Sequence, residues 1–139
     1  MSRARSLSRR YAVQALYQWQ LTGQAVDEVC KQFVDDRGLG KADKAYFSEI
    51  LFQVVSNIES LDEILSPYLD RSVGKVDPVE RAILRLGICE LSLHEEIPYK
   101  VVLNEAVELA KMFGSQNGHK YINGILDQAV QKLREKEVS

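Results

Sequence analysis

The 139-residue sequence predicts an all-α protein with about seven helices in two small bundles of the three-helix type. Apolar residues recur at spacings of three and four along most of the chain, and no useful length alternates as a half-buried strand does. The segment 72–76 is the clearest connection. The single domain, 1–139, is therefore divided into an N-terminal subdomain, 1–70, and a C-terminal subdomain, 71–139.

Four helices are expected before this connection. The first covers about residues 8–22 and the second about 26–37, because glycines follow both segments. The third has one buried face, formed by Phe47, Ile50, Leu51, Val54, Val55 and Ile58. A short fourth helix has an apolar face formed by Leu61, Ile64, Leu65 and Tyr68.

The fifth helix has the strongest start signal. Asp77 suits the N-cap, Pro78 the first helical position and Glu80 the third. The helix extends to about Glu95 and is apolar nearly all round, which predicts a central position in its bundle. Its expected buried residues are Ala82, Ile83, Leu84, Leu86, Ile88, Leu91 and Leu93.

Two further helices complete the chain. The sixth follows Pro98 and ends at Gly114, and Ser115 is expected to cap the seventh. The tail 134–139 is charged and is expected to be frayed and solvated.

Composition favours a soluble cytoplasmic protein. No segment approaches the roughly 18 consecutive apolar residues of a membrane helix. Cys30 and Cys89 lie far apart without CxxC spacing, which is typical of reduced thiols in the cytosol.

Enzymatic chemistry has little support. The two histidines, His94 and His119, have no partners at metal-ligand spacing. There is no glycine-rich phosphate loop and no nucleophile elbow. We expect no catalytic residues, metal or cofactor.

The N-terminus is strongly basic. Arg3, Arg5, Arg9 and Arg10 lie in the first ten residues without any acid, although the whole chain carries a net charge of −2. This asymmetry predicts a flexible, anion-binding arginine arm on an acidic body. Transit peptides share the Arg/Ser mixture, but here a helical pattern begins by residue 8, without a cleavable spacer.

The first helix has a polar row that suits RNA. Arg10, Gln14 and Tyr17 fall on one side, opposite a core face of Ala12, Ala15, Leu16 and Trp19. Arginine forks phosphate, glutamine reads base edges and tyrosine offers a stacking surface. Arg9 is also expected off the core face. The row equally fits an ordinary solvated face with a partly shielded Tyr17.

The last helix has a second candidate surface. Lys120 and Gly124 point away from its apolar face, and Tyr121 lies at the edge. Glycine inside a helix costs up to about 1 kcal/mol relative to alanine and usually marks a close approach. At Gly124 the approaching group is either a ligand or another helix of the same bundle.

Six blocks resemble the NusB family in order over nearly the whole chain. They are Arg9–Gln20, Tyr46-Phe47, Val79–Arg85 with Glu90-Leu91, Pro98–Lys111, Phe113-Gly114 and His119–Asp127. The resemblance implies seven helices in two bundles and no enzyme activity. It implies a transcription antitermination factor that binds boxA-type single-stranded RNA of ribosomal-operon leaders together with NusE, a small-subunit ribosomal protein, within an RNA-polymerase antitermination complex.

The resemblance also implies site residues. RNA contacts are expected at Arg3, Arg5, Arg9, Arg10, Gln14, Lys120 and Tyr121. The NusE surface is expected at or near Tyr17, Glu80 and Arg81. The sequence departs from the family in its serine-diluted arm and in a loop, 115–118, without acids.

Two alternatives remain. One is a stand-alone relative of the NusB-like domain of ribosomal-RNA cytosine methyltransferases. The other is a helical protein-binding adaptor without RNA sequence preference, whose arginine arm docks on an acidic partner.

Overall fold

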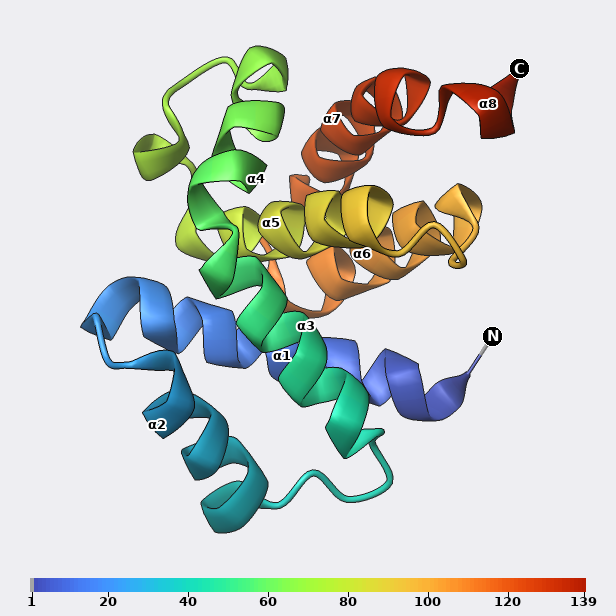
Figure 1. The fold of residues 1–139 in the computed structure, drawn as a ribbon. Coiled ribbons are helices and arrows are strands. Elements are labelled where there is room, and N and C mark those ends of the chain that lie inside the picture. The colour runs from blue at the N-terminus through green and yellow to red at the C-terminus, as the bar shows by residue number, and fades with distance from the viewer. Residues whose placement is uncertain (1) are drawn as a thin grey trace. The chain divides into compact units, whose positions relative to one another are not determined.

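The structure is a computed structural model that describes residues 2–139, and every regular element in that range is helical (Figure 1). The predicted all-α class is thus confirmed. The chain divides into two compact units, one ending at Ser56 and the other covering Asn57–Ser139. No helix in the described range is long and apolar enough to cross a membrane.

The first unit contains three helices. They are α1 (Arg3–Thr22), α2 (Val26–Lys31), which continues as a π-helical segment (Gln32–Arg37), and α3 (Lys44–Ser56). Helix α1 packs on both α2 and α3. Gly23 ends α1 because it adopts the left-handed conformation, with a φ of 71°, and donates its N–H to the carbonyl of Trp19. The core of this unit includes Leu16, Val29, Phe33, Phe47, Ile50, Leu51 and Val54.

The arginine arm is helical, which corrects the expected flexible arm. Helix α1 begins at Arg3 because the Ser2 hydroxyl accepts a hydrogen bond from the Arg5 N–H at 3.2 Å and so caps the helix. The positive charges at its N-terminus oppose the helix dipole. The first turns of α1 also contact Asp43 at the start of α3.

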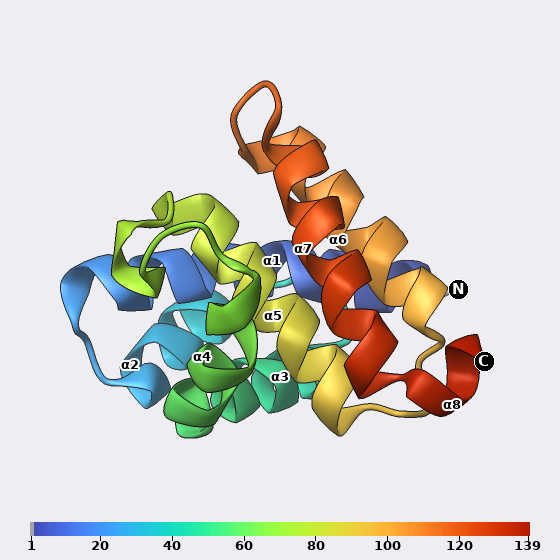
Figure 2. The same cartoon turned by 90° about the horizontal axis from the view of Figure 1, so that it is seen from above.

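The second unit is built around one central helix. Its main helices are α4 (Ile58–Leu65), α5 (Pro78–Leu93), α6 (Tyr99–Phe113) and α7 (Gly118–Leu133), and a short α8 (Glu135–Val138) follows. Single 3₁₀ turns, Ser66–Tyr68 and Val73–Lys75, lie between α4 and α5. Helix α5 packs against α4, α6 and α7, which confirms its predicted central position, and α6 and α7 lie side by side (Figure 2).

The start of α5 is capped as predicted. The carboxylate of Asp77 accepts hydrogen bonds from the N–H groups of Val79 and Glu80, both at 3.1 Å, and Pro78 occupies the first turn. The helix ends at Leu93, whose side chain is exposed, whereas the sequence predicted this residue inside. Leu93 lies in the last turn of the helix, where the buried face ends.

The boundary between the units lies at Ser56, and the predicted division at residue 70 differs from it. Helix α4 belongs with α5 because Leu61 and Leu65 are buried and Asp62 pairs with Arg85. The two nitrogens of Arg85 lie 3.0 and 2.8 Å from the two carboxylate oxygens of Asp62. This bidentate pair joins segments that the sequence placed on opposite sides of the connection.

The C-terminal tail is attached to the bundle, which corrects the expected frayed tail. Arg134 is only 6% exposed and donates to the carbonyls of Leu91 at 2.9 Å and His94 at 3.0 Å. Its remaining nitrogen pairs with Glu137, which also accepts from the Tyr99 N–H at 2.9 Å. A buried guanidinium thus satisfies carbonyls at the end of α5.

The start of α7 also differs from the expectation that Ser115 caps it. The helix begins at Gly118, and the preceding Asn117 makes no side-chain cap hydrogen bond. Ser115 instead accepts the Gly118 N–H through its main-chain carbonyl at 3.0 Å, in a turn before the helix.

Candidate nucleic-acid interface

The polar row on α1 points outward as predicted. Arg10 is exposed, Gln14 is partly exposed and Tyr17 is 39% exposed. We call these three residues the α1 row. On the opposite side Ala12, Ala15 and Leu16 are fully buried, whereas Trp19 is only partly buried.

Arg37, which the sequence analysis did not single out, joins the α1 row. Its Nη1 lies 3.3 Å from Gln14 Oε1, and Gln14 Nε2 donates to the Arg10 carbonyl at 3.3 Å. The Arg37 guanidinium lies 4.4 Å from the centre of the Phe33 ring. The Arg37 guanidinium therefore lies beside the amide of Gln14, and Arg10 precedes Gln14 by one helical turn on the same side of α1. No sequence signal linked Arg37 to the row, because only the fold brings the π-helical segment beside α1.

The N-terminal arginines differ in their accessibility. Arg3 is exposed, whereas Arg5 is partly exposed, with its guanidinium 4.4 Å from the centre of the Tyr46 ring. Arg9 is only 2% exposed and lies 5.4 Å from the same ring centre. The expectation that Arg9 lies off the core face is therefore wrong.

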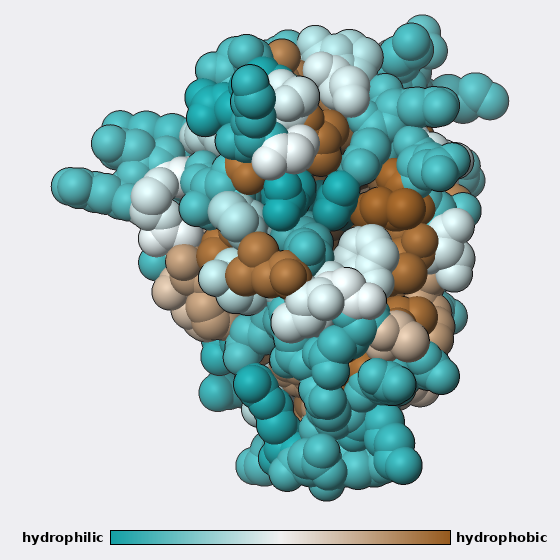
Figure 3. All heavy atoms as spheres, turned by 90° about the vertical axis from the view of Figure 1, so that its left-hand side faces the viewer, coloured by the Kyte–Doolittle hydropathy of each residue, from teal (hydrophilic) through white to brown (hydrophobic). Residues whose placement is uncertain are grey.

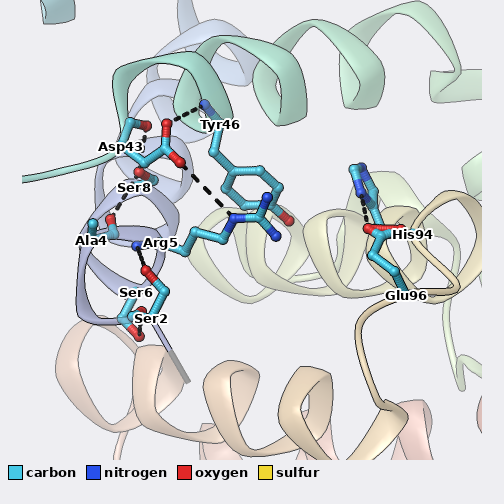
Figure 4. Close-up of polar contacts among 9 residues, drawn as sticks. All are labelled: Ser2, Ala4, Arg5, Ser6, Ser8, Asp43, Tyr46, His94 and Glu96. Carbon is cyan, nitrogen blue, oxygen red and sulfur yellow. Dashed lines mark hydrogen bonds and ion pairs between the residues drawn. The ribbon is translucent and has the colours of Figure 1, made fainter.

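The first turns of α1 are tied to the start of α3 (Figure 4). The Asp43 N–H donates to the Ala4 carbonyl at 3.2 Å, and the buried Ser8 hydroxyl donates to the Asp43 carbonyl at 2.7 Å. The carboxylate of Asp43 accepts from the Tyr46 N–H at 3.0 Å and lies 4.0 Å from the Arg5 Nε. Asp43 thus organises the arm and partly neutralises Arg5.

The sequence left open whether a ligand or another helix approaches α7 at Gly124, and the structure shows that this part of α7 is exposed. Lys120 and Gly124 are exposed, and a Cβ atom added at Gly124 would meet nothing within 4 Å. Packing against another helix therefore does not account for this glycine. The close approach that helical packing requires is found at Gly87 instead, where an added Cβ atom would lie 2.9 Å from Leu126 Cδ1.

Tyr121 lies in a polar cluster with Asp70 and Arg71. Its hydroxyl donates to Asp70 Oδ1 at 3.4 Å, and the Arg71 guanidinium lies 5.4 Å from its ring centre. Arg71 and Asp70 form a bidentate pair at 2.8 and 2.9 Å, and this hydrogen bonding holds the pKa of Asp70 below its usual value. Burial raises the pKa of Tyr121. The ring is thus a neutral, positioned aromatic surface with a cation beside it.

Glu80 borders a small pocket next to this cluster. The pocket has a volume of about 290 Å³ and is lined by Arg71, Asp77, Glu80, Ser115, Asn117, Gly118 and Tyr121. Glu80 is 8% exposed, and burial, together with the charge of Asp77, raises its pKa. The Glu80 carboxyl thus lies at a pocket whose other lining side chains are mostly polar.

The Arg81 side chain binds main-chain carbonyls of the turn before α5. Its Nη1 donates to the carbonyls of Gly74 at 3.1 Å and Val73 at 3.5 Å, and its buried Nε has no hydrogen-bond partner. Burial lowers the pKa of Arg81. The residue therefore holds the turn before α5 in place.

The exposed apolar surface is sparse in the described part of the chain. The large apolar side chains that are exposed are Tyr17, Leu21, Leu93 and Met112. The face drawn in Figure 3 is mostly hydrophilic, with separate hydrophobic areas. In residues 2–139 no group of three or more His, Cys, Asp or Glu side chains is arranged to hold a metal ion.

Comparisons with known proteins point to one family. The family model described as the NusB family matches residues 6–131. The chain is 55% identical to the transcription antitermination protein NusB of Nitrosococcus oceani, over 99% of this chain and 92% of that protein. It is 48% identical to the protein of the same name from Alcanivorax borkumensis, over 98% and 91% of the two chains.

A similar fold is found among solved structures. A chain of the crystal structure of the antitermination factors NusB and NusE in complex with dsRNA superposes with a TM-score of 0.86 at 30% identity. The match covers 94% of this chain and 98% of that one.

Proposed function

Because the chain belongs to the NusB family of transcription antitermination proteins, we propose that it binds boxA-type single-stranded RNA of ribosomal-operon leaders together with NusE. Proteins of this family are regulators of transcription and not enzymes. In the proposed role the protein acts in the cytoplasm, as part of an RNA-polymerase antitermination complex.

The observation that carries the RNA part of the proposal is the α1 row with Arg37 beside it. The row offers a cation, an amide and a half-open phenol along one exposed side of a helix. Cations bind backbone phosphates, whereas an amide and an aromatic ring recognise unpaired bases. In this role Arg3, Arg5 and Arg10 hold phosphates, and Gln14 contacts a base edge.

Lys120 and Tyr121 form the second proposed RNA contact. Lys120 is exposed, and the absence of a side chain at Gly124 leaves room for a strand to approach α7 closely. A base can stack on the face of Tyr121 that Arg71 does not cover. Buried Arg9 supports this function through the arm and becomes a phosphate contact only if the arm rearranges.

The proposed NusE surface includes Tyr17, Glu80 and Arg81. Tyr17 is the exposed aromatic residue of the α1 row, and such residues commonly anchor protein interfaces. Glu80 borders the pocket, and Arg81 fixes the turn beside it. The RNA and NusE components of a similar structure support both partners.

The test is a titration of labelled boxA RNA with and without NusE. We expect tighter binding to boxA than to a scrambled strand of equal length, and a larger preference when NusE is present. A duplex of the boxA sequence serves as a control because the similar complex contains dsRNA. Equal affinity for boxA and scrambled strands, with or without NusE, would favour the adaptor and contradict the proposal.

A further inference from the structure

Arg37 makes two side-chain contacts beside the α1 row, one with Gln14 and one with Phe33. It is the last residue of the π-helical segment, and its side chain is exposed. The guanidinium lies 4.4 Å from the centre of the Phe33 ring, and Phe33 itself is 1% exposed. A buried ring is a fixed platform, so cation–π contact limits the conformations of Arg37.

The contact with Arg37 also fixes the orientation of the Gln14 amide. A guanidinium carries only donors, so the Gln14 atom that faces it must be the oxygen. The amide nitrogen then faces the main-chain carbonyl of Arg10 and donates to it at 3.3 Å. Both contacts require the same orientation. One N–H of Gln14 remains available as a donor.

Neither flanking cation is neutralised. In the part of the chain that the structure describes, no carboxylate forms an ion pair with Arg10 or Arg37, although Asp35 and Asp36 precede Arg37 directly. Arg5, by contrast, lies beside Asp43. The two exposed guanidiniums are therefore free to bind an anion that passes along Gln14, and a nucleic-acid backbone supplies a row of such anions.

We propose that Arg37 is a further RNA-binding residue. Its guanidinium binds a backbone phosphate of the strand held by Arg10, and its contact with Gln14 presents the amide N–H to acceptor groups on the bases. This inference rests on the proposed function. It extends the RNA surface from α1 to the segment that follows α2.

Two substitutions separate the charge from the geometry. Arg37→Met keeps an apolar stem over Phe33 and removes the charge and all donors. Arg37→Lys keeps the charge but loses the planar fork. Lys41→Met is the matched control because Lys41 is an exposed cation of the same unit and, among the described residues, forms no hydrogen bond or ion pair with the α1 row. The measurement is the dissociation constant for boxA and scrambled RNA between 0.1 and 1 M salt.

We expect Arg37→Met to reduce the log–log salt slope by about 0.7, the value for one phosphate contact with a single strand. A change of 0.7 in slope means that the ratio of the unsubstituted protein's affinity to the variant's affinity is about fivefold larger at 0.1 M salt than at 1 M salt. Arg37→Lys should keep the slope but lose part of the preference for boxA. Lys41→Met should change neither quantity.

Several outcomes overturn the inference. An unchanged slope in Arg37→Met, beside a reduced slope in Arg10→Met, shows that Arg37 does not bind phosphate, while the proposed function stands. An equal loss in Lys41→Met shows an effect of total charge. If Arg37→Lys keeps the full preference for boxA over scrambled RNA, Arg37 does not contribute to base recognition by orienting the Gln14 amide. Failure of the unsubstituted protein to bind either RNA refutes the proposed function itself. Thermal melting checks the fold, and Arg37→Gln replaces the methionine variant if that variant melts early.

Discussion

The hydroxyl of Ser8 donates a 2.7 Å hydrogen bond to the main-chain carbonyl of Asp43, the residue that precedes α3. Ser8 is fully buried, so the donor of this bond is shielded from water. It joins the arginine-rich end of α1 to α3 and so makes the arm part of the folded unit. The arm that the sequence predicted as a flexible RNA-binding segment is therefore also part of the packing of the first unit.

Arg9 and Arg10 are expected to respond differently to substitution by alanine. Arg9→Ala should lower the free energy of unfolding by about 1–3 kcal/mol, because it removes a buried side chain that lies over the Tyr46 ring. Arg10→Ala should leave stability nearly unchanged, because Arg10 is exposed. Urea denaturation of the two variants tests the difference. Equal stability would show that the burial of Arg9 is not required by the fold.

Gly87 and Gly124 form a second pair of opposite expectations. Gly87→Ala should destabilise the protein by about 1–3 kcal/mol, because the new Cβ atom would lie 2.9 Å from Leu126 Cδ1. Gly124→Ala should stabilise it by about 0.4–1 kcal/mol, because the position is open and helical. Thermal melting measures both. Gly124→Ala should also weaken RNA binding if a strand approaches α7 there, and wild-type RNA affinity would argue against that approach.

Arg134 is expected to stabilise the second unit. Arg134→Met should lower the free energy of unfolding by about 1–3 kcal/mol, because it removes the Arg134 donor to the Leu91 carbonyl and one of the two donors to the His94 carbonyl, which also accepts from the Ile97 N–H. The exposed Lys132 provides the control, and Lys132→Met should have little effect. Denaturant unfolding compares them. A loss smaller than about 0.5 kcal/mol for Arg134→Met would mean that the tail does not anchor α5 in solution.

Glu80 is expected to make stability depend on pH. Its pKa is raised in the folded protein by burial and by Asp77, so the folded state favours the protonated carboxyl. This contribution to stability is present below the pKa of the unfolded chain, about 4.3, and is lost as pH rises through the higher folded value. Glu80→Gln should therefore raise the melting temperature more at pH 7 than at pH 4. An equal effect at both pH values would contradict the shift.

Much of the fold follows from local signals in the sequence. Asp77 and Pro78 start α5 as predicted, Gly23 ends α1, and the apolar circumference of α5 places it between three other helices. These features depend on residues that are close in sequence. The same holds for the α1 row, whose outward direction follows from helical periodicity alone.

The sequence-based predictions fail where charged side chains are buried in the structure. Arg9 precedes Leu16 by seven residues, about two helical turns, so it shares the buried side of α1 in spite of its charge. Arg134 follows a helix and looks like part of a charged tail, yet its partners lie at the end of α5. Arg37 has no local signal at all. Such partners are far apart in sequence, and residue spacing does not encode them.

The cap that Ser2 forms on the first turn of α1 has a consequence for the energetics of RNA capture. A disordered basic tail loses backbone freedom when it closes on a ligand, at a cost of roughly 1–2 kcal/mol for each residue fixed. Here folding has already fixed Arg3 and Arg5, so a strand meets cations at helical spacing and binding does not have to order them. The affinity should therefore respond to removal of this cap, as in Ser2→Ala, even though the serine itself need not touch RNA.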